Sequence, residues 1–575
     1  MAAPELIDSR RLTGPNLISA SPGAVIDVSL GGLSAKRVIE VWREQSRRIL
    51  EAVGWSDAEL ATRDFPGGAS LMMSAPIDAL YAATEVNEWA WSATQAQLAG
   101  SPEPDLDEGA ERLRQVMAEE QNPRLIALQE AAAERGVCFL SDDDLVSVGM
   151  GSGSITWPVD ELPNPSEVAW NDVHNVPVAL ITGSNGKTTT VRLLAAIATA
   201  QRHSPGYTST DGIYVDGQLV DADDWSGPGG ARRVLRDKRV DIAILETARG
   251  GMLRRGLAVQ RADAAIVTNV AADHLGEFGV HDVEGVAEAK LVVSRAIESG
   301  NNLVLNAEDP AVVSLASRLG LRPTWFAINP NSAPTRAHID GGGEACFVED
   351  GWFVAIKAGK RAQLVPVADA PLTFEGSSRY NISNALGAIA VARALDISDN
   401  AIRAGLYAFG ETPDQNPGRA NFFELGGARV IVDFAHNPHG LEAFIEMASA
   451  MSAERRLLIL GQAGDRDDES IRELALVAAR HSLDRIIIKE LQKYLRGREE
   501  GEVPGLLETT LREAGMSGET LVQSTDEMQA VRDALEWARP DDLLLLPLHT
   551  HRDEVLDLLS SLVERGWHPG EELPL

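Results

Sequence analysis

Short apolar runs alternate with longer amphipathic segments over most of this chain. The run at residues 178–182 leads through a turn, bounded by Gly183 and Gly186, into residues 187–198, where good helix formers carry apolar residues at helical spacing. Further β-branched runs and helical segments then alternate, as a sheet with helical crossovers requires. The pattern predicts an α/β fold with a mostly parallel sheet in the central part of the chain.

The two flanking regions have different patterns. In the last third we predict strands at residues 429–433, 456–460, 485–489 and 543–548 and helices at 440–453 and 470–480, a Rossmann-like layer without the dinucleotide fingerprint. In the first 160 residues we predict amphipathic helices at 36–53, 76–98 and 107–135 among turn-rich pieces. These differences divide the chain into a mixed N-terminal domain (1–165), a central domain (175–412) and a C-terminal domain (413–575).

The turn after the strand at 178–182 has the composition of a phosphate-binding loop. Turn amides and a helix N-terminus present N–H groups to an anion, Lys187 can reach a β- or γ-phosphate, and the Thr188 hydroxyl suits Mg²⁺. The spacing is tighter than GxxxxGK[ST], because Ile181 stands where the first glycine would be. The residues expected to contact phosphate are Gly183, Ser184, Asn185, Gly186, Lys187, Thr188 and Thr189.

Three later positions are candidates for the same site, and each has an ordinary alternative. Glu246 ends a buried strand, at the edge where open α/β sheets bind ligands, but carboxylates also end strands without any such role. His274 follows another strand, where a capping role is common. Lys290 lies in a helix predicted at 282–297, where a lysine is usually a solvated charge.

Composition excludes several classes of function. Lys plus Arg number 52 against 85 Asp plus Glu, which gives a net charge of −33 and disfavours nucleic acid and anionic membranes as partners. The two cysteines, Cys138 and Cys346, cannot form a disulfide framework. The sequence contains neither a signal-peptide pattern at its start nor an apolar run of the roughly 18 to 20 residues that a membrane span needs. We therefore expect a cytoplasmic protein.

Several motifs together resemble the Mur ligase family of ATP-dependent amide ligases. The phosphate turn, Glu246-Thr-Ala-Arg-Gly-Gly251, residues 269–274 and Lys290 occur in the family's order, and 380–388, 417–419 and 432–438 resemble its later motifs. The resemblance is greatest to the Mur-ligase-like half of cyanophycin synthetases. It includes Pro-Gly-Arg-Ala-Asn at 417–421, Gly-Asp-Arg-Asp-Asp-Glu at 464–469 and Leu-Arg-Gly-Arg at 495–498, and it covers roughly residues 175–505.

The resemblance implies roles for individual residues. Lys187 would neutralise the transferred phosphoryl group of ATP, Thr188 and Glu246 would hold one Mg²⁺, and His274 a second. Lys290 stands where many family members carry a carbamylated lysine, an anionic metal ligand. Asn381 and Asn384 would contact adenine, and Arg419 and Asp433 the nucleotide. The residues expected to recognise the substrates are Arg249, His436, Asp465, Arg466, Arg496 and Arg498.

The ATP-grasp module of full cyanophycin synthetases has no counterpart in this sequence. The resemblance therefore implies a shortened relative with one ATP site, which activates a substrate carboxylate as an acyl phosphate and joins it to an amine such as arginine on an acidic or cyanophycin-like acceptor. A ligase for an unrelated acceptor, a nucleotide-binding scaffold of a polymer-forming ligase and a plain nucleotide hydrolase remain alternatives, and a homo-oligomer is left open.

Two further polar segments are interpreted as ordinary structure. The glycine-rich residues 149–154 lack a following Lys-Thr and helix, so we expect a flexible connector there. His549 and His551 stand two residues apart on a predicted loop, which is a weak metal signal, and we expect them to be surface residues.

Overall fold

The computed structural model describes residues 3–273, 275–298 and 302–574. The predicted site residue His274 lies outside these ranges. The chain forms two compact units, each with its own hydrophobic core. The first comprises Met1–Phe347, Val354–Leu364 and Leu386–Gly405, and the second comprises Val348–Phe353, Val365–Ala385 and Leu406–Leu575.

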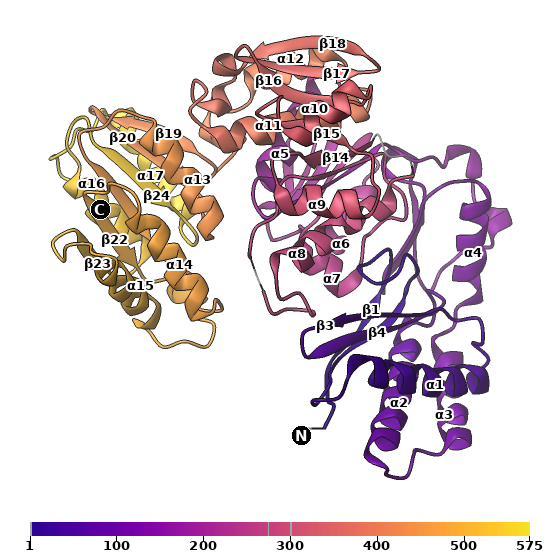
Figure 1. The fold of residues 1–575 in the computed structure, drawn as a ribbon. Helices are drawn as coiled ribbons and strands as arrows, with labels where there is room; N and C mark the ends of the chain where they lie inside the picture. Colours follow the sequence, from indigo (N-terminus) through magenta and orange to yellow (C-terminus); the bar gives the residue numbers. More distant parts are fainter. Residues whose placement is uncertain (1–2, 274, 299–301, 575) are drawn as a thin grey trace. The chain divides into compact units, whose positions relative to one another are not determined.

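The first unit begins with a four-stranded antiparallel sheet of strand order β1-β2-β4-β3. Helices α1, α2 and α3 lie together on one face of this sheet (Figure 1) and bury Trp42 and Trp91 with it. The elements are β1 (Leu6–Leu12), β2 (Gly23–Ser29), α1 (Ala35–Val53), β3 (Leu60–Phe65), β4 (Gly68–Ser74), α2 (Leu80–Ala99) and α3 (Leu106–Glu120).

The prediction of a single helix at 107–135 is wrong. The structure has α3 and a separate α4 (Pro123–Glu134), because the Asn122 side chain caps the second helix and Pro123 occupies its first turn. Proline is compatible with a first helical turn but interrupts a helix interior, so Asn-Pro is a start signal. The helix predicted at 76–98 begins four residues later than expected, at Leu80.

The glycine-rich segment 149–154 is packed rather than flexible, which corrects the predicted connector. It connects the second and third strands of a small antiparallel sheet. The strands are β5 (Phe139–Ser141), β6 (Leu145–Val148) and β7 (Ile155–Pro158). The Ser152 amide donates to the Val240 carbonyl oxygen over 2.7 Å. Gly151 has φ +55°, and a Cβ there would overlap that same oxygen. Backbone contact therefore explains the glycine.

The central sheet of the first unit has the strand order β11-β10-β9-β12-β8-β13-β14-β15-β16-β17-β18. From β9 to β16 its pairings are parallel, with β12 and β13 flanking β8. The strands are β8 (Val178–Thr182), β9 (Pro205–Ser209), β10 (Gly212–Val215), β11 (Gln218–Asp221), β12 (Ile242–Glu246), β13 (Ala264–Val267), β14 (Leu303–Asn306), β15 (Thr324–Ala327), β16 (Ala345–Glu349), β17 (Trp352–Lys357) and β18 (Lys360–Pro366). This confirms the predicted α/β class.

Helices connect these strands and complete the core. Val178 and Leu180 belong to one large buried cluster, and alternation along the strand turns Ala179 and Ile181 to the opposite face. The helices are α5 (Lys187–Ala200), α6 (Pro228–Leu235), α7 (Arg249–Arg255), α8 (Val283–Lys290), α9 (Pro310–Arg318), α10 (Ala333–Asp340), α11 (Arg379–Ala394) and α12 (Asp399–Ala408). The helix predicted at 282–297 ends earlier, at Lys290, and continues as a 3-10 helix over Leu291–Ala296.

The N-terminal sheet is hydrogen-bonded to the central part of the same unit. The amide of Thr13 donates to the Arg255 carbonyl oxygen over 2.7 Å, and the Arg10 side chain donates to the Leu253 carbonyl oxygen over 3.0 Å. Farther along the sheet, Arg63 donates to the Gly279 carbonyl oxygen over 2.9 Å. The sheet therefore contacts the end of α7 and the loop before α8.

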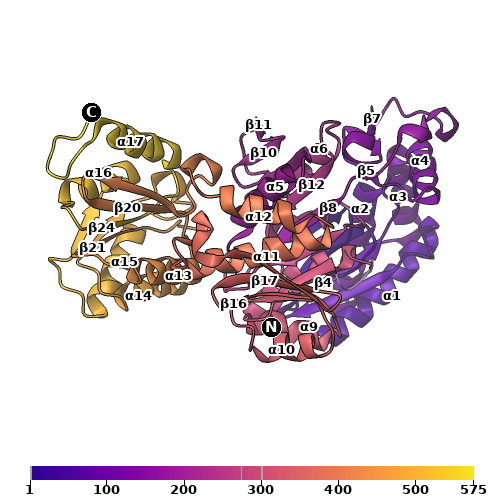
Figure 2. The ribbon, with the colours of Figure 1, turned by 90° about the horizontal axis from the view of Figure 1, so that it is seen from above.

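The second unit contains a six-stranded sheet of order β19-β20-β24-β21-β22-β23 between two helical layers (Figure 2). It consists of β19 (Asn421–Leu425), β20 (Ala428–Asp433), α13 (Pro438–Ser449), β21 (Arg456–Leu460), α14 (Asp468–Ala479), β22 (Arg485–Lys489), α15 (Glu502–Glu513), β23 (Leu521–Ser524), α16 (Glu527–Trp537), β24 (Leu543–Pro547) and α17 (Arg552–Arg565). The predicted Rossmann-like layer is confirmed. None of the helices in the described ranges combines the length and apolarity needed to span a bilayer.

Candidate active site

The phosphate turn connects β8, a central strand, to the N-terminus of α5. Gly186 caps the helix with φ +82°, and Gly183 has φ +151° with no room for a Cβ beside Thr268 Oγ1. The turn is fixed from β13, because the Asn185 amide donates to Asn269 Oδ1 over 2.9 Å and Thr268 Oγ1 donates to the Asn185 carbonyl oxygen over 2.7 Å. A turn held in this way has its amides oriented before any anion binds.

Two oxygen ligands suited to Mg²⁺ meet beside this turn. Thr188 Oγ1 donates to Glu246 Oε2 over 2.9 Å, and the Glu246 residue is 1% exposed. The register of β12 on β8 pairs Glu246 with Ile181, which brings the strand end to the turn. Hydroxyl and carboxylate oxygens are the ligands that Mg²⁺ prefers, so this pair fits the ion. In the described part of the chain, no group of three or more His, Cys, Asp and Glu residues forms a metal cluster.

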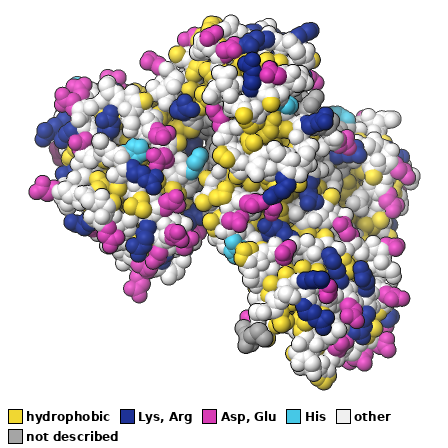
Figure 3. All heavy atoms as spheres, viewed as in Figure 1, with side chains coloured by type: hydrophobic (Ala, Val, Ile, Leu, Met, Phe, Trp, Pro, Cys, Tyr) yellow, Lys and Arg dark blue, Asp and Glu magenta, His cyan; other side chains and the backbone are white. Residues whose placement is uncertain are grey.

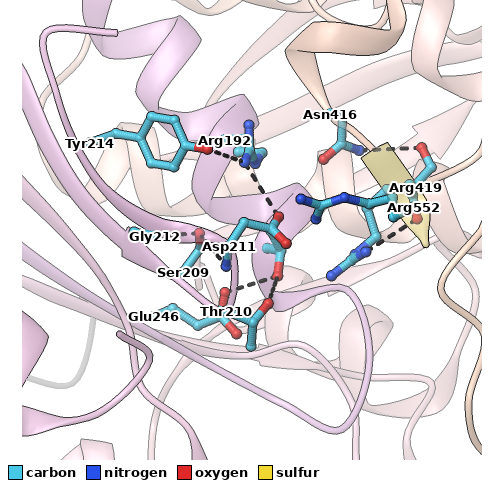
Figure 4. Close-up of polar contacts among 12 residues, drawn as sticks. Arg192, Ser209, Thr210, Asp211, Gly212, Tyr214, Glu246, Asn416, Arg419 and Arg552 are labelled. Atoms are coloured by element: carbon cyan, nitrogen blue, oxygen red, sulfur yellow. Dashed lines mark hydrogen bonds and ion pairs between the residues drawn. The ribbon is translucent and has the colours of Figure 1, made fainter. Parts of the chain in front are cut away.

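A polar turn between β9 and β10 adds residues that the sequence analysis missed. Thr210 Oγ1 lies 3.5 Å from Thr188 Oγ1, and Arg192 donates to Asp211 over 3.3 Å and to the Tyr214 hydroxyl over 3.2 Å (Figure 4). The available signal was a polar run, 208–211, at the carboxyl end of a strand parallel to β12. Because that run has no glycine pattern, it was not recognised.

Lys290 is buried beside two other cations. Its pKa is lowered well below the ordinary value, first by burial and then by the positive charges of Lys187 and Arg249, which outweigh the attraction of Asp273 and Asp309. Arg249 is 8% exposed and donates to Glu277 Oε2 over 3.0 Å. Lys187 itself donates to the carbonyl oxygens of residues 183 and 184. The structure thus brings Lys187, Arg249 and Lys290 within electrostatic reach of one another, and burial favours the uncharged form of the Lys290 amine.

The predicted nucleotide-contacting residues of the second unit lie in two groups. Asn384 Nδ2 donates to Asn381 Oδ1 over 3.3 Å, and Asn381 Nδ2 donates to the Leu372 carbonyl oxygen over 2.9 Å. At the end of β20, Asp433 accepts from the Ala420 amide over 2.9 Å and from the Tyr380 hydroxyl over 3.5 Å. Burial raises the pKa of Asp433 to about 6, although the nearby Arg419 charge lowers it.

The predicted substrate residues of the second unit lie on two facing loops. Asp465 pairs with Arg496, and Arg498 donates to the Gly464 carbonyl oxygen over 3.0 Å and to the Arg466 carbonyl oxygen over 2.8 Å. Asp468 and Glu502 also pair with Arg498, so its guanidinium group joins the loops. His436 lies on another loop, after β20, and its carbonyl oxygen accepts from the side chain of Gln462, just after β21, over 3.0 Å. A role in substrate binding stays a prediction for these residues.

His549 is buried, which corrects its predicted surface position. Its side chain is 7% exposed, its ring contacts Phe434, and Nε2 lies 3.2 Å from the Ala435 carbonyl oxygen. Burial and the Lys489 charge lower its pKa. Behind it, Lys489 and Glu527 form an ion pair whose side chains are fully buried. Glu527 also accepts the backbone amides of residues 549–551 over 2.7 to 2.8 Å.

Two family models match the chain. The Mur ligase middle domain matches residues 181–392, and the Mur ligase glutamate ligase domain matches residues 418–547. A cyanophycin synthetase of Trichormus variabilis is 37% identical over 68% of this chain and 43% of its own length. The chain thus spans less than half of the cyanophycin synthetases it matches. A UDP-N-acetylmuramoyl-L-alanyl-D-glutamate–2,6-diaminopimelate ligase of Geobacter metallireducens is 26% identical over 67% of this chain and 75% of its own.

Solved structures with a similar fold include FolC of E. coli in complex with ADP. It has a TM-score of 0.48 and 21% sequence identity, over 68% of this chain and 90% of that one. A MurF structure from Acinetobacter baumannii has a TM-score of 0.47 and 18% identity, over 67% of this chain and 77% of that one.

The buried ion pair generates a stability prediction. Lys489→Met should lower the free energy of unfolding by about 3 kcal/mol or more, because it leaves the Glu527 carboxylate buried without its cation. Arg496→Gln, which removes the partly exposed pair with Asp465, should cost at most about 1 kcal/mol. Urea unfolding of both variants measures the difference. Equal losses would show that the Lys489 charge is not needed to compensate Glu527.

The raised pKa of Asp433 generates a pH prediction. Between about pH 4 and pH 6 an unfolded aspartate loses its proton while the buried Asp433 retains it, so the stability contributed by the protonated form declines as pH rises through this window. A difference of about two pKa units corresponds to about 3 kcal/mol. Asp433→Asn should therefore be less sensitive than the wild type over this window in urea unfolding at pH 4, 5, 6 and 7. Parallel pH profiles would contradict it.

Proposed function

The chain belongs to the Mur ligase family, and on that premise we propose that it is an ATP-dependent, ADP-forming ligase that joins a carboxylate to an amine. The observation that carries the proposal is the turn at 183–188 with Glu246 hydrogen-bonded to its Thr188 hydroxyl and Lys290 buried nearby. This set of donors and acceptors suits a triphosphate with its Mg²⁺.

The proposed reaction has two steps. A substrate carboxylate oxygen attacks the γ-phosphorus of ATP, ADP leaves, and an acyl phosphate forms. The amine nitrogen then attacks the acyl carbon, phosphate leaves, and the nitrogen loses a proton to give the amide. Phosphoryl transfer needs charge neutralisation and in-line positioning, which the turn amides and the Lys187 ammonium group would supply.

A divalent cation would be held by Thr188 and Glu246, and when bound it would neutralise charge on the phosphates. We assign a further oxygen ligand to Lys290 after carbamylation. Its amine, in the uncharged form that burial favours, can attack CO₂ and lose a proton, which gives an anionic carbamate. The Lys187 and Arg249 charges, which disfavour a cation at Lys290, would stabilise that anion.

We propose an acidic or cyanophycin-like acceptor and an amine such as arginine as the substrates. The 37% identity to a cyanophycin synthetase supports this choice, although the chain spans only 43% of that relative. Arg249 is the candidate for the acceptor carboxylate, because it is buried beside Lys187 and Lys290. Arg496 and His436 are candidates for the amine substrate. The adenine contacts are assigned to Asn381 and Asn384.

The direct test measures ADP release with Mg²⁺-ATP. The panel contains acidic amino acids, β-aspartyl dipeptides and short Asp/Arg peptides, each with and without arginine or another amine. We expect release that requires both an acid and an amine, with a product mass equal to their sum minus water. Lys187→Ala should lower kcat by about a hundredfold or more, because it removes a charge aimed at the transferred phosphoryl group. ATP turnover without any acceptor would instead indicate a hydrolase.

The carbamylation of Lys290 has its own test. In ¹³C-bicarbonate the wild type should show a carbamate carbon signal by NMR that Lys290→Gln lacks, because burial favours the uncharged form of the Lys290 amine, which reacts with CO₂. Removal of CO₂ should lower ligase activity of the wild type, and bicarbonate should restore it. An unchanged spectrum on substitution of Lys290 would refute the modification.

A further inference from the structure

Five arginine residues gather where the N-terminal sheet meets α6 and α7. Arg11 lies on β1, Arg232 on α6 and Arg236 directly after it, and Arg254 and Arg255 end α7. Figure 3 shows further Lys and Arg side chains over α1 and the N-terminal strands, with Asp and Glu side chains among them. The five arginines stand out because the whole chain carries a net charge of −33.

Only two of the five guanidinium groups have a carboxylate partner among the described residues. Arg236 pairs with Asp142 over 2.5 Å, and Arg11 pairs with Asp143 over 3.0 Å. Arg232 donates to the Thr13 hydroxyl over 2.8 Å. In the described ranges, Arg255 donates to the backbone carbonyl oxygens of residues 11 and 254 and to no carboxylate. Five cations against two carboxylates leave three positive charges uncompensated within this group.

The uncompensated charges interact with one another. Burial lowers the pKa of Arg232, and the charges of Arg236 and Arg255 lower it further, while Asp142 and Asp143 act in the opposite direction. Burial likewise lowers the pKa of Arg255, as do the charges of Arg11 and Arg254. Arg232 is only 9% exposed. A buried charge is normally paired, because desolvation without a partner is unfavourable.

A purely structural role does not account for the cluster. The contact between Arg232 and Thr13 joins α6 to the N-terminal sheet, but a neutral hydrogen-bond donor would also make it. Arg254 is exposed and adds charge at the end of α7 without an ion pair in the described ranges. Guanidinium groups bind carboxylate oxygens through paired hydrogen bonds, so a ligand with several carboxylates would compensate these charges.

Helix α7 connects the cluster to the candidate active site. It begins at Arg249, beside Lys290, and ends at Arg255, about 9 Å away along the helix axis at 1.5 Å per residue. Gly250, in its first turn, is exposed, with open space where a Cβ would lie. About three residues of extended peptide cover the same distance.

We propose that Arg232, Arg254 and Arg255 bind carboxylates of an acidic peptide acceptor, about three or more residues away from its reacting carboxylate. The proposal rests on the proposed function for the identity of this ligand. It adds a second binding site, at the seam between the N-terminal sheet and α7, which would favour an oligomeric acid over a single amino acid as acceptor.

The test measures binding of a fluorescein-labelled ten-residue aspartate peptide to the full chain by anisotropy, without ATP. Arg254→Gln/Arg255→Gln should raise Kd by about tenfold or more, as expected for lost hydrogen bonds between charged groups. Arg233→Gln is the matched control, because Arg233 lies next to Arg232 on α6 but pairs with Asp221. Its Kd should stay within about twofold of the wild type, as expected for an exposed pair.

Three results would overturn the proposed site: no binding by the wild type, unchanged affinity in the double variant, or an equal loss in Arg233→Gln. Arg254→Gln alone, at an exposed position, replaces the double variant if that variant does not fold. Wild-type ADP release with the acid and amine panel separates the two proposals. If the wild type turns over ATP but the double variant binds the peptide equally well, the ligase proposal stands and the arginine binding site is rejected. If the double variant loses binding but the wild type shows no turnover, the binding site stands and the ligase proposal is rejected.

Discussion

The candidate site depends on the close approach of two strand ends. β8 and β13 are neighbours in the sheet, and at their carboxyl ends Thr268 leaves no room for a side chain at residue 183. The Thr268 side chain is itself held in place, because its hydroxyl donates a hydrogen bond to the Asn185 carbonyl oxygen. The turn amides, Lys187 and Thr188 all take their positions from this contact. The register of β12 then brings Glu246 to Thr188.

Much of the fold was predictable from local patterns, because strand alternation and helix spacing repeat over many residues. The phosphate turn and Glu246 were predictable because the turn follows one apolar strand and Glu246 ends another. The helix boundary at Pro123 was missed, because the amphipathic pattern continues across it. The packing of residues 149–154 could not be read locally, because it depends on Val240, about 90 residues away in sequence. The burial of His549 depends likewise on Glu527 and Ala435, which no local pattern reveals.

Buried charge distinguishes the two units. In the first, the charges of Lys187 and Arg249 disfavour a cation at the buried Lys290, although Asp273 and Asp309 favour it and Glu277 pairs with Arg249. In the second, Lys489 and Glu527 compensate each other without a ligand, and Glu527 also orders the backbone of residues 549–551. The first arrangement is suited to binding and the second to rigidity.

The hydrogen bonds between the N-terminal sheet and the central part of the first unit limit how this chain can be divided. The carbonyl oxygens of Leu253, Arg255 and Gly279 all accept from N-terminal residues. A recombinant fragment that began at the phosphate strand would expose these acceptors together with the apolar surface around them. The N-terminal region is thus a structural part of the first unit rather than a separate domain on a linker. A chimeric protein that exchanged either part would have to keep the residues that form these hydrogen bonds.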